Sequence, residues 1–352
     1  MYKSFPLIEL SCYNTDMQQL PFFVRSIEYY IREAFIKYND IDSISEHIIE
    51  DYKSRYFTKS DEKLLKLYFK NDVSQEDLDN FLSVWDIERE GGQKALLLAY
   101  FMKQHPELTY PQYVEPRLQG VLKYFQYKNM VLMSHFKKIC SAIKQKNVDI
   151  MIMKGGAIRH INHDYPRIMG DIDILVHIDD YKTAVDTALS FGYKYYAFQH
   201  SIDIYDPVAG FLLDIHSMLD MFTSANYKNS IYNEFFERAR SEKVFNVENI
   251  YVPCPEDAMF ILLVNFNKNL AQGMGTNNFL FYIADSIFLL NSKPDFNWDI
   301  VKQNAVKSKT ESQIYITLRL LNEYISTKIP VFFADEFNEK CRLLIFGENA
   351  ES

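Results

Sequence analysis

The sequence has few cysteines and glycines and no long hydrophobic segment. The four cysteines are far apart and form no CxxC pair, which excludes a cysteine-based zinc site and a disulfide framework. They are Cys12, Cys140, Cys254 and Cys341. The longest apolar runs, at residues 95–102 and 258–264, are far shorter than the roughly 20 residues of a transmembrane helix. Since the first residues also lack the pattern of a signal peptide, we expect a reduced, cytoplasmic protein that does not bind a membrane.

Basic residues are too few for a broad nucleic-acid-binding surface. The 38 Lys and Arg are outnumbered by 47 Asp and Glu, which gives a net charge of −9. A protein that binds DNA or RNA over a large area needs a basic face, so the charge argues against extended nucleic acid as the main partner and leaves room only for a local basic groove. The 352 residues, 48% of them hydrophobic, suffice for more than one core and exclude wholesale disorder.

The spacing of apolar residues divides the chain into three regions. Residues 1–116 and 223–352 show the three- and four-residue spacing that is typical of helices. Residues 117–222 begin with a long predicted helix and continue with short apolar and β-branched runs that predict strands. These runs are at 148–153, 170–177, 193–198, 201–205 and 211–217, and a hairpin or an extended pair is predicted at 244–252. We expect an α+β fold with a small mixed sheet between helical N-terminal and C-terminal regions.

Glycines cluster at the end of the first predicted strand. Lys154-Gly155-Gly156 follows this strand and precedes a short helix predicted from Ala157 to His163. Paired glycines before a helix let backbone N–H groups approach a phosphate, and a helix N-terminus favours negative charge. A tight strand-to-helix turn without any ligand explains the same residues, so this motif alone does not establish a function.

Two aspartates share one face of the second strand. Asp171 and Asp173 are two residues apart, so both carboxylates point the same way, while Ile172 and Ile174 point toward the core. Adjacent acids on one strand face repel each other unless a cation lies between them. A solvated polar edge is the alternative, but the largely apolar strand disfavours it.

A third acid interrupts the apolar strand at 211–217. Asp214 would be costly to bury unless it is paired or binds a metal, and His216 lies on the same face and is a candidate to support it. An edge-strand acid beside a simple sheet histidine remains the alternative. Lys154 and Arg167 supply positive charge nearby. For Lys154 the alternatives are a contact with a phosphate, a contact with a carboxylate, or a position at the end of a strand without any role in the site. For Arg167 they are a contact with a phosphate or an ion pair with an acid of the site.

Together these residues predict phosphoryl-transfer chemistry. Three carboxylates on two strands beside a phosphate-friendly turn suit Mg²⁺, which binds through carboxylates and substrate phosphates. Two metals at such a site activate an attacking oxygen and stabilise the leaving one. Positioning and charge neutralisation supply most of the catalysis in reactions of this kind.

Three segments resemble the uncharacterised bacterial nucleotidyltransferase family of the DNA polymerase β-like nucleotidyltransferase superfamily. They are residues 153–157 (MKGGA), 167–176 (RIMGDIDILV) and 213–216 (LDIH). The match is strongest over about 148–220 and weaker at Ala284-Asp285-Ser286-Ile287 and Asn297-Trp298-Asp299, and the first 115 or so residues add little. The resemblance implies a small mixed sheet with flanking helices and transfer of a nucleoside monophosphate from an NTP.

The resemblance also assigns roles to residues. Asp171 and Asp173 match the paired metal ligands, and Asp214 matches the third acid, which holds the catalytic Mg²⁺ or Mn²⁺ and orients or deprotonates an acceptor hydroxyl. Gly155 and Gly156 match the turn that holds the NTP phosphates. The acceptor is expected to be a small molecule or a protein. The superfamily turn more often reads Gly-Ser, so a catalytically inactive nucleotide-binding or protein-interaction module that retains the fold is the alternative.

Overall fold

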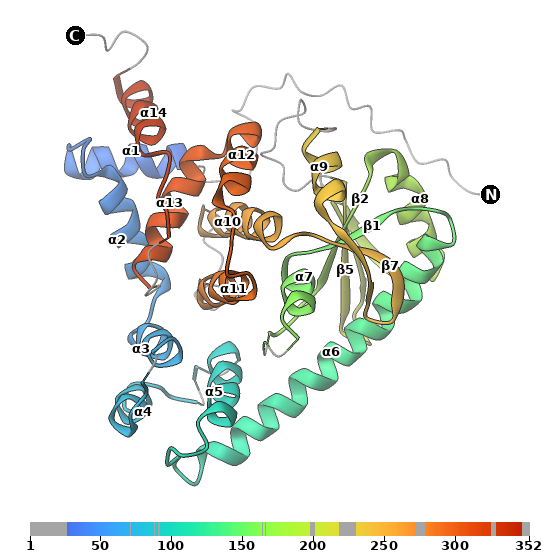
Figure 1. Cartoon of the computed structure of the whole chain (residues 1–352), viewed down its shortest axis with the longest axis horizontal. Coiled ribbons are helices and arrows are strands. Elements are labelled where there is room, and N and C mark those ends of the chain that lie inside the picture. Colours follow the sequence, from blue (N-terminus) through green and yellow to red (C-terminus); the bar gives the residue numbers. More distant parts are fainter. Residues whose placement is uncertain are drawn as a thin grey trace.

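The computed structural model of the chain describes residues 27–346, except for residues 71, 88, 91, 164, 166, 198–200, 218–229, 272–278 and 325–328. Cys12 and the N-terminal residues considered above lie outside this part. The described residues contain fourteen helices and one seven-stranded mixed sheet (Figure 1). The α+β class predicted from the sequence is therefore confirmed.

The sheet has the strand order β3-β4-β5-β2-β1-β7-β6. Its strands are β1 (Ile150–Met153), β2 (Ile172–Val176), β3 (Lys194–Ala197), β4 (Ser201–Asp206), β5 (Phe211–His216), β6 (Arg240–Val244) and β7 (Val247–Val252). The pairs β1–β7 and β2–β5 are parallel and the others are antiparallel. All five strands predicted before residue 222 are present. The segment predicted at 244–252 contains β7, but the hairpin begins at Arg240, so most of β6 lies before the predicted segment. The tight turn of this hairpin uses Phe245 and Asn246, both with positive φ.

Each face of the sheet is covered by helices. One face packs its isoleucines, such as Ile152 and Ile174, against buried residues of α6 (Val114–Lys144) and α8 (Ile178–Leu189). The other face, with Met153 and Leu175, packs on α7 (Lys154–Ile161) and on the large helical core. The alternation along β1 and β2 explains this division, because successive side chains point to opposite faces. Ile172 and Ile174 are buried as predicted.

The N-terminal and C-terminal helices share one hydrophobic core, because α1 packs on α14 and α2 on α13. The N-terminal helices are α1 (Ile27–Tyr38), α2 (Ile44–Tyr56), α3 (Lys59–Tyr68), α4 (Gln75–Leu82) and α5 (Gln93–Gln104). The later ones are α9 (Ser230–Arg238), α10 (Pro255–Ala271), α11 (Phe279–Ser292), α12 (Trp298–Ser308), α13 (Glu311–Asn322) and α14 (Ala334–Phe346). Ser74 and Asp77 form a capping box at the start of α4.

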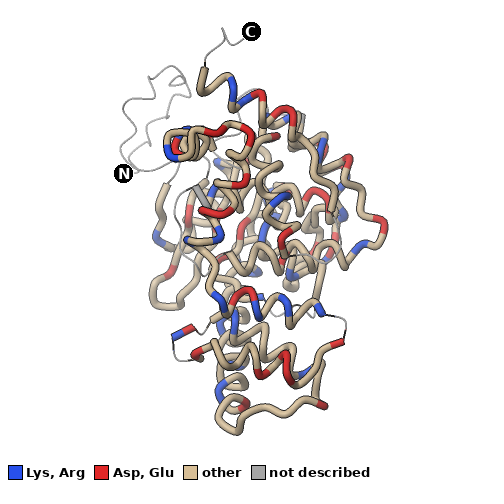
Figure 2. Tube along the Cα trace, turned by 90° about the vertical axis from the view of Figure 1, so that its left-hand side faces the viewer, with Lys and Arg blue, Asp and Glu red and all other residues tan. Residues whose placement is uncertain are grey.

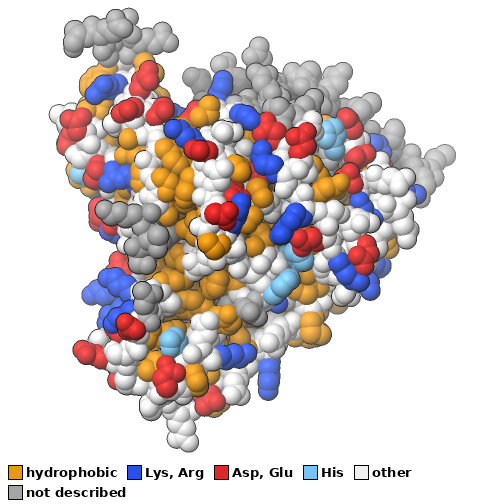
Figure 3. Space-filling model, in the orientation of Figure 1, with side chains coloured by type: hydrophobic (Ala, Val, Ile, Leu, Met, Phe, Trp, Pro, Cys, Tyr) orange, Lys and Arg blue, Asp and Glu red, His pale blue; other side chains and the backbone are white. Residues whose placement is uncertain are grey.

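The 31-residue helix α6 connects the lower helices α3–α5 to the sheet and crosses the molecule diagonally (Figure 1). Within the described residues, no helix is both long enough and apolar enough to cross a membrane. Acidic and basic side chains lie next to each other over the face shown in Figure 3, which has no large area of one charge sign.

Candidate functional site

The sheet brings three aspartates onto one face. Asp173 in β2 lies directly opposite Asp214 in the parallel strand β5, and Asp214 lies opposite Asp203 in the antiparallel strand β4. The neighbours of these acids along each strand are isoleucines and leucines buried on the α6 side. The carboxylates therefore point to the other face, toward the C-terminal helices.

A cavity of about 480 Å³ separates these acids from the C-terminal helices. Its helical wall consists of Asn265, Lys268 and Asn269 from α10 and of Phe281 and Tyr282 from α11. Six of the seven site residues predicted from the sequence line it: Lys154, Gly155, Arg167, Asp171, Asp173 and Asp214. The site thus lies between the sheet and the C-terminal helices.

Asp173 is the most strongly paired of the acids. It is 4% exposed, Lys154 Nζ contacts its Oδ1, and His216 Nε2 lies 2.9 Å from the same oxygen. Burial alone would raise the pKa of Asp173, but Lys154 and His216 outweigh burial and lower it well below its usual range. Burial and the nearby Lys154 lower the pKa of His216 to about 4. The sequence suggested that His216 supports Asp214; its contact in the structure is instead with Asp173.

Asp214 has no comparable partner. Its Oδ1 is buried and accepts no hydrogen bond from the described residues. Burial and the charges of Asp173 and Asp171 raise the pKa of Asp214 to about 9. Burial and Asp173 likewise raise the pKa of Asp171 to about 6. A buried carboxylate that faces other acids is the arrangement that a divalent cation stabilises.

The residues placed to bind a divalent metal differ in part from the predicted ligands. One ligand atom from each of Asp173, Asp214 and His216 lies within 4.8 Å of the other two. Asp171 lines the same cavity but, among the described residues, stands outside this group. Two carboxylates beside a cavity with room for phosphates suit Mg²⁺ or Mn²⁺. Because Lys154 Nζ lies against Oδ1 of Asp173, a metal bound there either shares this carboxylate with Lys154 or displaces the ammonium group.

Lys154 takes an uncommon backbone conformation at the junction of β1 and α7. Its φ is +46°, in the left-handed region that residues other than glycine rarely adopt. The helix begins at Lys154 rather than at Ala157, so Gly155 and Gly156 form its first turn. First-turn N–H groups have no partner within a helix and are available to an anion.

Gly155 is required by the close approach of Arg167. A Cβ at position 155 would lie 2.2 Å from Arg167 Nη1 and 2.6 Å from Cζ. Arg167 is held in place because its Nε donates to both oxygens of Asp285 at 3.0 and 2.9 Å and its Nη1 donates to the carbonyl of Ile168 at 2.9 Å. Arg167 thus lines the cavity, but its acidic partner is Asp285 of α11 rather than one of the three predicted acids.

Gly156 has a packing role in the structure. It is buried and, unlike Gly155, is not among the described residues that line the cavity. A Cβ at this position would lie 2.8 and 2.9 Å from Cδ1 and Cγ1 of Ile152. A serine here would therefore collide with the side chain of Ile152 in the core of the sheet, so packing alone accounts for the glycine. Its contact with NTP phosphates stays a prediction.

Gly155→Ala is expected to destabilise the fold by about 1–3 kcal/mol, because the new methyl group must displace the pinned guanidinium of Arg167. Thermal unfolding measures the effect. Gly120→Ala is the matched control, since a Cβ at Gly120 in the exposed middle of α6 meets nothing within 4 Å. That change should stabilise the helix by about 0.5–1 kcal/mol. Equal unfolding temperatures for the two variants would show that Arg167 moves without cost.

The sequence did not reveal several residues of the site. Asp203 lies beside Asp214, and burial raises its pKa. Its alternation with Ile202 and Ile204 was visible, but the register that places it opposite Asp214 was not. From α10, Asn265 Nδ2 donates to the hydroxyl of Tyr282 at 2.9 Å, and Asn269 Nδ2 donates to the same oxygen. No sequence motif marks these residues.

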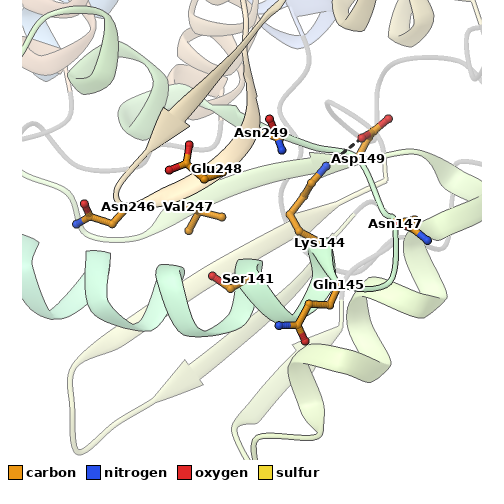
Figure 4. A pocket seen from close by; sticks show the side chains of 9 residues that line it. All are labelled: Ser141, Lys144, Gln145, Asn147, Asp149, Asn246, Val247, Glu248 and Asn249. Atoms are coloured by element: carbon orange, nitrogen blue, oxygen red, sulfur yellow. Dashed lines mark hydrogen bonds and ion pairs between the residues drawn. The ribbon is translucent and has the colours of Figure 1, made fainter.

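A larger cavity of about 600 Å³ lies at the other end of β1 (Figure 4). It is bordered by the end of α6, by Asp149, by Asn246 in the β6–β7 turn and by the first residues of β7. Its charged groups include an ion pair, in which Lys144 Nζ is 3.0 Å from Asp149 Oδ1. It does not contain the predicted acids or the glycine turn, so we place the functional site at the smaller cavity.

Comparison with known proteins shows the family of the chain. Two solved structures show a limited similarity. The antibiotic-resistance factor ANT(2'')-Ia is 11% identical, with a TM-score of 0.35 over 55% of this chain and 97% of its own. The STING-associated CdnE c-di-GMP synthase from Capnocytophaga granulosa is 16% identical, with a TM-score of 0.26 over 84% of this chain and 95% of its own. No curated protein matches the sequence.

A family model described as uncharacterised nucleotidyltransferase matches residues 89–326. This range is about two thirds of the chain and includes every residue of the site. The chain therefore belongs to this nucleotidyltransferase family.

Proposed function

We propose that the protein is a metal-dependent nucleotidyltransferase that moves a nucleoside monophosphate from an NTP to a hydroxyl of a small-molecule or protein acceptor. The observation that supports this most strongly is the pair formed by Asp173 and Asp214. They face each other on adjacent strands beside a cavity of about 480 Å³, and Oδ1 of Asp214 is buried without a hydrogen-bond partner in the described part of the chain. This is a site for a cation and a polyphosphate.

In the proposed reaction, Asp173 and Asp214 hold Mg²⁺ or Mn²⁺, with Asp171 as a further acid at the rim. When bound, the metal neutralises the phosphate charge and polarises the reacting phosphoryl group. Asp214 accepts the proton of the acceptor hydroxyl, whose oxygen forms a bond to the α-phosphorus. The bond from the α-phosphorus to the bridging oxygen breaks, and pyrophosphate leaves.

The rest of the cavity suits the NTP. Lys154 and Lys268 place ammonium groups on the sheet wall and on the helical wall, where they offset the charge of a triphosphate. Gly155 belongs to the first turn of α7 and lines the same cavity, so its N–H has no partner within the helix and is available to a phosphate. A cavity of about 480 Å³ has the size of a small-ligand site rather than of a nucleic-acid channel. A small or side-chain acceptor therefore fits the site.

Release of pyrophosphate tests this proposal. The protein is incubated with Mg²⁺, labelled NTPs and cell extract, pyrophosphate is quantified, and nucleotidylated products are identified by mass spectrometry. We expect Mg²⁺-dependent release that is lost in Asp171→Ala and Asp173→Ala. Unchanged release in either variant would contradict the proposed roles of these acids.

The contact between Lys154 and Asp173 favours a second candidate function, because the ammonium group neutralises Asp173 without any metal. In this alternative the protein is an inactive nucleotide-binding or protein-interaction module. Calorimetry with Mg·ATP, followed by a search for nucleotidylated product, separates the two. Binding without any product supports the module, whereas binding with product supports the enzyme.

A further inference from the structure

The charge of α6 differs from that of the rest of the chain. Residues 116–148 contain seven Lys and Arg and no Asp or Glu, although the chain has 47 acids in 352 residues. At that average density, a stretch of this length would contain about four acids. Acidic and basic residues are interspersed along the helices on the side shown in Figure 2. The long helix therefore carries a local positive charge on a protein whose net charge is −9.

One face of α6 is exposed to solvent along its middle and second half. Tyr124 is 53% exposed, and Tyr127 and Met130 are each 64% exposed. These residues lie on the side of the helix opposite to its buried face, which packs on the sheet. With the exposed lysines of this side they form what we call the α6 strip: Lys123, Tyr124, Tyr127, Lys128, Met130, Lys137 and Lys138. The helical rise gives the strip a length of about 22 Å.

The lysines of the α6 strip are not neutralised by the protein. Within the part of the chain that the structure describes, no carboxylate lies within ion-pair distance of Lys123, Lys128, Lys137 or Lys138. Lys128 Nζ instead lies 5.4 Å from the centroid of the Tyr124 ring, and Lys138 Nζ lies 4.7 Å from that of Phe191. The strip thus presents positive charge and exposed aromatic rings together.

We propose that the α6 strip binds single-stranded nucleic acid. Lysines attract the phosphate backbone, and exposed aromatic rings stack on unpaired bases without regard to sequence. An acidic protein would match the charge, but protein–protein interfaces are depleted in lysine, and every cation of the strip is lysine. The strip is the local basic surface that the net charge of the chain leaves room for, and it is separate from the cavity of the active site.

The α6 strip lies on the same helical turns that position the site. Asn129, between Lys128 and Met130 in the sequence, is 5% exposed and points inward. Its Nδ2 donates to the carbonyl of Arg167 at 3.2 Å, and its Oδ1 accepts from the N–H of Met169 at 3.3 Å. Arg167 and Ile168 line the cavity. A strand bound to the strip would therefore lie on the back of the helix that holds this segment.

Fluorescence anisotropy with labelled single-stranded RNA and DNA of about 12 nucleotides tests the proposal. The full chain is titrated without NTP and with chelator, between about 50 and 200 mM salt. We expect the affinity to fall as the salt concentration rises. The double variant Lys123→Glu with Lys128→Glu should lower the affinity at least about tenfold. Tyr124→Ala with Tyr127→Ala should weaken it by about tenfold or more while leaving the salt dependence intact.

The matched control is Lys66→Glu with Lys103→Glu. These lysines are exposed on α3 and α5, so the double variant makes the same change in net charge away from the α6 strip and should bind as the wild type does. Thermal unfolding shows whether each variant is folded. If the Lys123→Glu and Lys128→Glu double variant is unfolded, Lys123→Gln with Lys128→Gln replaces it. No binding by the wild type, an equal loss in the control, or no effect of the tyrosine changes would overturn the proposal. If polyglutamate displaced the labelled nucleic acid equally well from the wild type and from the tyrosine variant, the strip would be assigned to an acidic protein instead.

Discussion

Asp214→Asn is expected to abolish nucleotidyl transfer and to leave the fold at least as stable as the wild type. Metal stabilisation of the transition state is worth several kcal/mol, so loss of the ligand should lower the rate by about a thousandfold or more. The Asp214 carboxylate faces Asp173 and Asp203, and its buried Oδ1 has no hydrogen-bond partner among the described residues. Burial and the neighbouring acids raise the pKa of Asp214 to about 9, so at neutral pH this side chain must take up a proton when the chain folds, whereas asparagine is neutral in both states. The change should therefore raise the free energy of unfolding by up to about 2 kcal/mol. Rates of pyrophosphate release and thermal unfolding measure the two effects.

Asp173→Asn provides the contrast for this prediction. It should abolish transfer as well, but it should also destabilise the fold by about 3–5 kcal/mol, because it leaves Lys154 without its buried partner. Asp295→Asn, at an exposed position after α11, is the control and should change neither quantity. If Asp214→Asn instead destabilised the protein as much as Asp173→Asn, Asp214 would be a structural residue.

Asp285→Ala is expected to destabilise the protein by about 3–5 kcal/mol and to impair transfer. Asp285 is completely buried in α11, and both of its oxygens accept hydrogen bonds from Arg167. Removing one partner of a buried ion pair leaves an uncompensated charge, which costs far more than the pair itself contributes. Arg167 lines the cavity, so its displacement should also weaken NTP binding.

A double-mutant cycle separates these effects. Arg167→Met with Asp285→Leu replaces both charges by apolar groups and should recover much of the lost stability, but not the transfer activity. Equal destabilisation by the single and the double variant would contradict the pairing. The pair joins the segment before β2 to α11, so it fixes the sheet wall of the cavity against its helical wall.

The sequence predicted the sheet and most of the cavity because both depend on local patterns. Alternation of acids and isoleucines in β2 and β5 placed Asp173 and Asp214 on one face. The glycine pair after β1 placed Gly155 at the cavity. The same pattern did not reveal the contacts of Lys154 and Arg167, because these depend on how segments distant in the sequence meet.

The missed features are those set by tertiary packing. Asp203 reaches the site through the register of β4 on β5, and Asp285 reaches Arg167 across 118 positions of the chain. The sequence predicted that Gly156 contacts a phosphate, whereas in the structure the side chain of Ile152 packs against Gly156 where a Cβ would lie. Only the structure shows that the helices at both ends of the chain share a core. Register, burial and interhelical contacts are not encoded in residue spacing alone.

A crystal structure with Mn²⁺ and a non-hydrolysable NTP analogue tests the central claim most directly. We predict an anomalous Mn²⁺ peak between the carboxylates of Asp173 and Asp214, with Lys154 released from Asp173 and the phosphates of the analogue beside Gly155. An analogue bound elsewhere, or Lys154 still in contact with Asp173 and no Mn²⁺ peak at saturating metal, would contradict the proposed nucleotidyltransferase site.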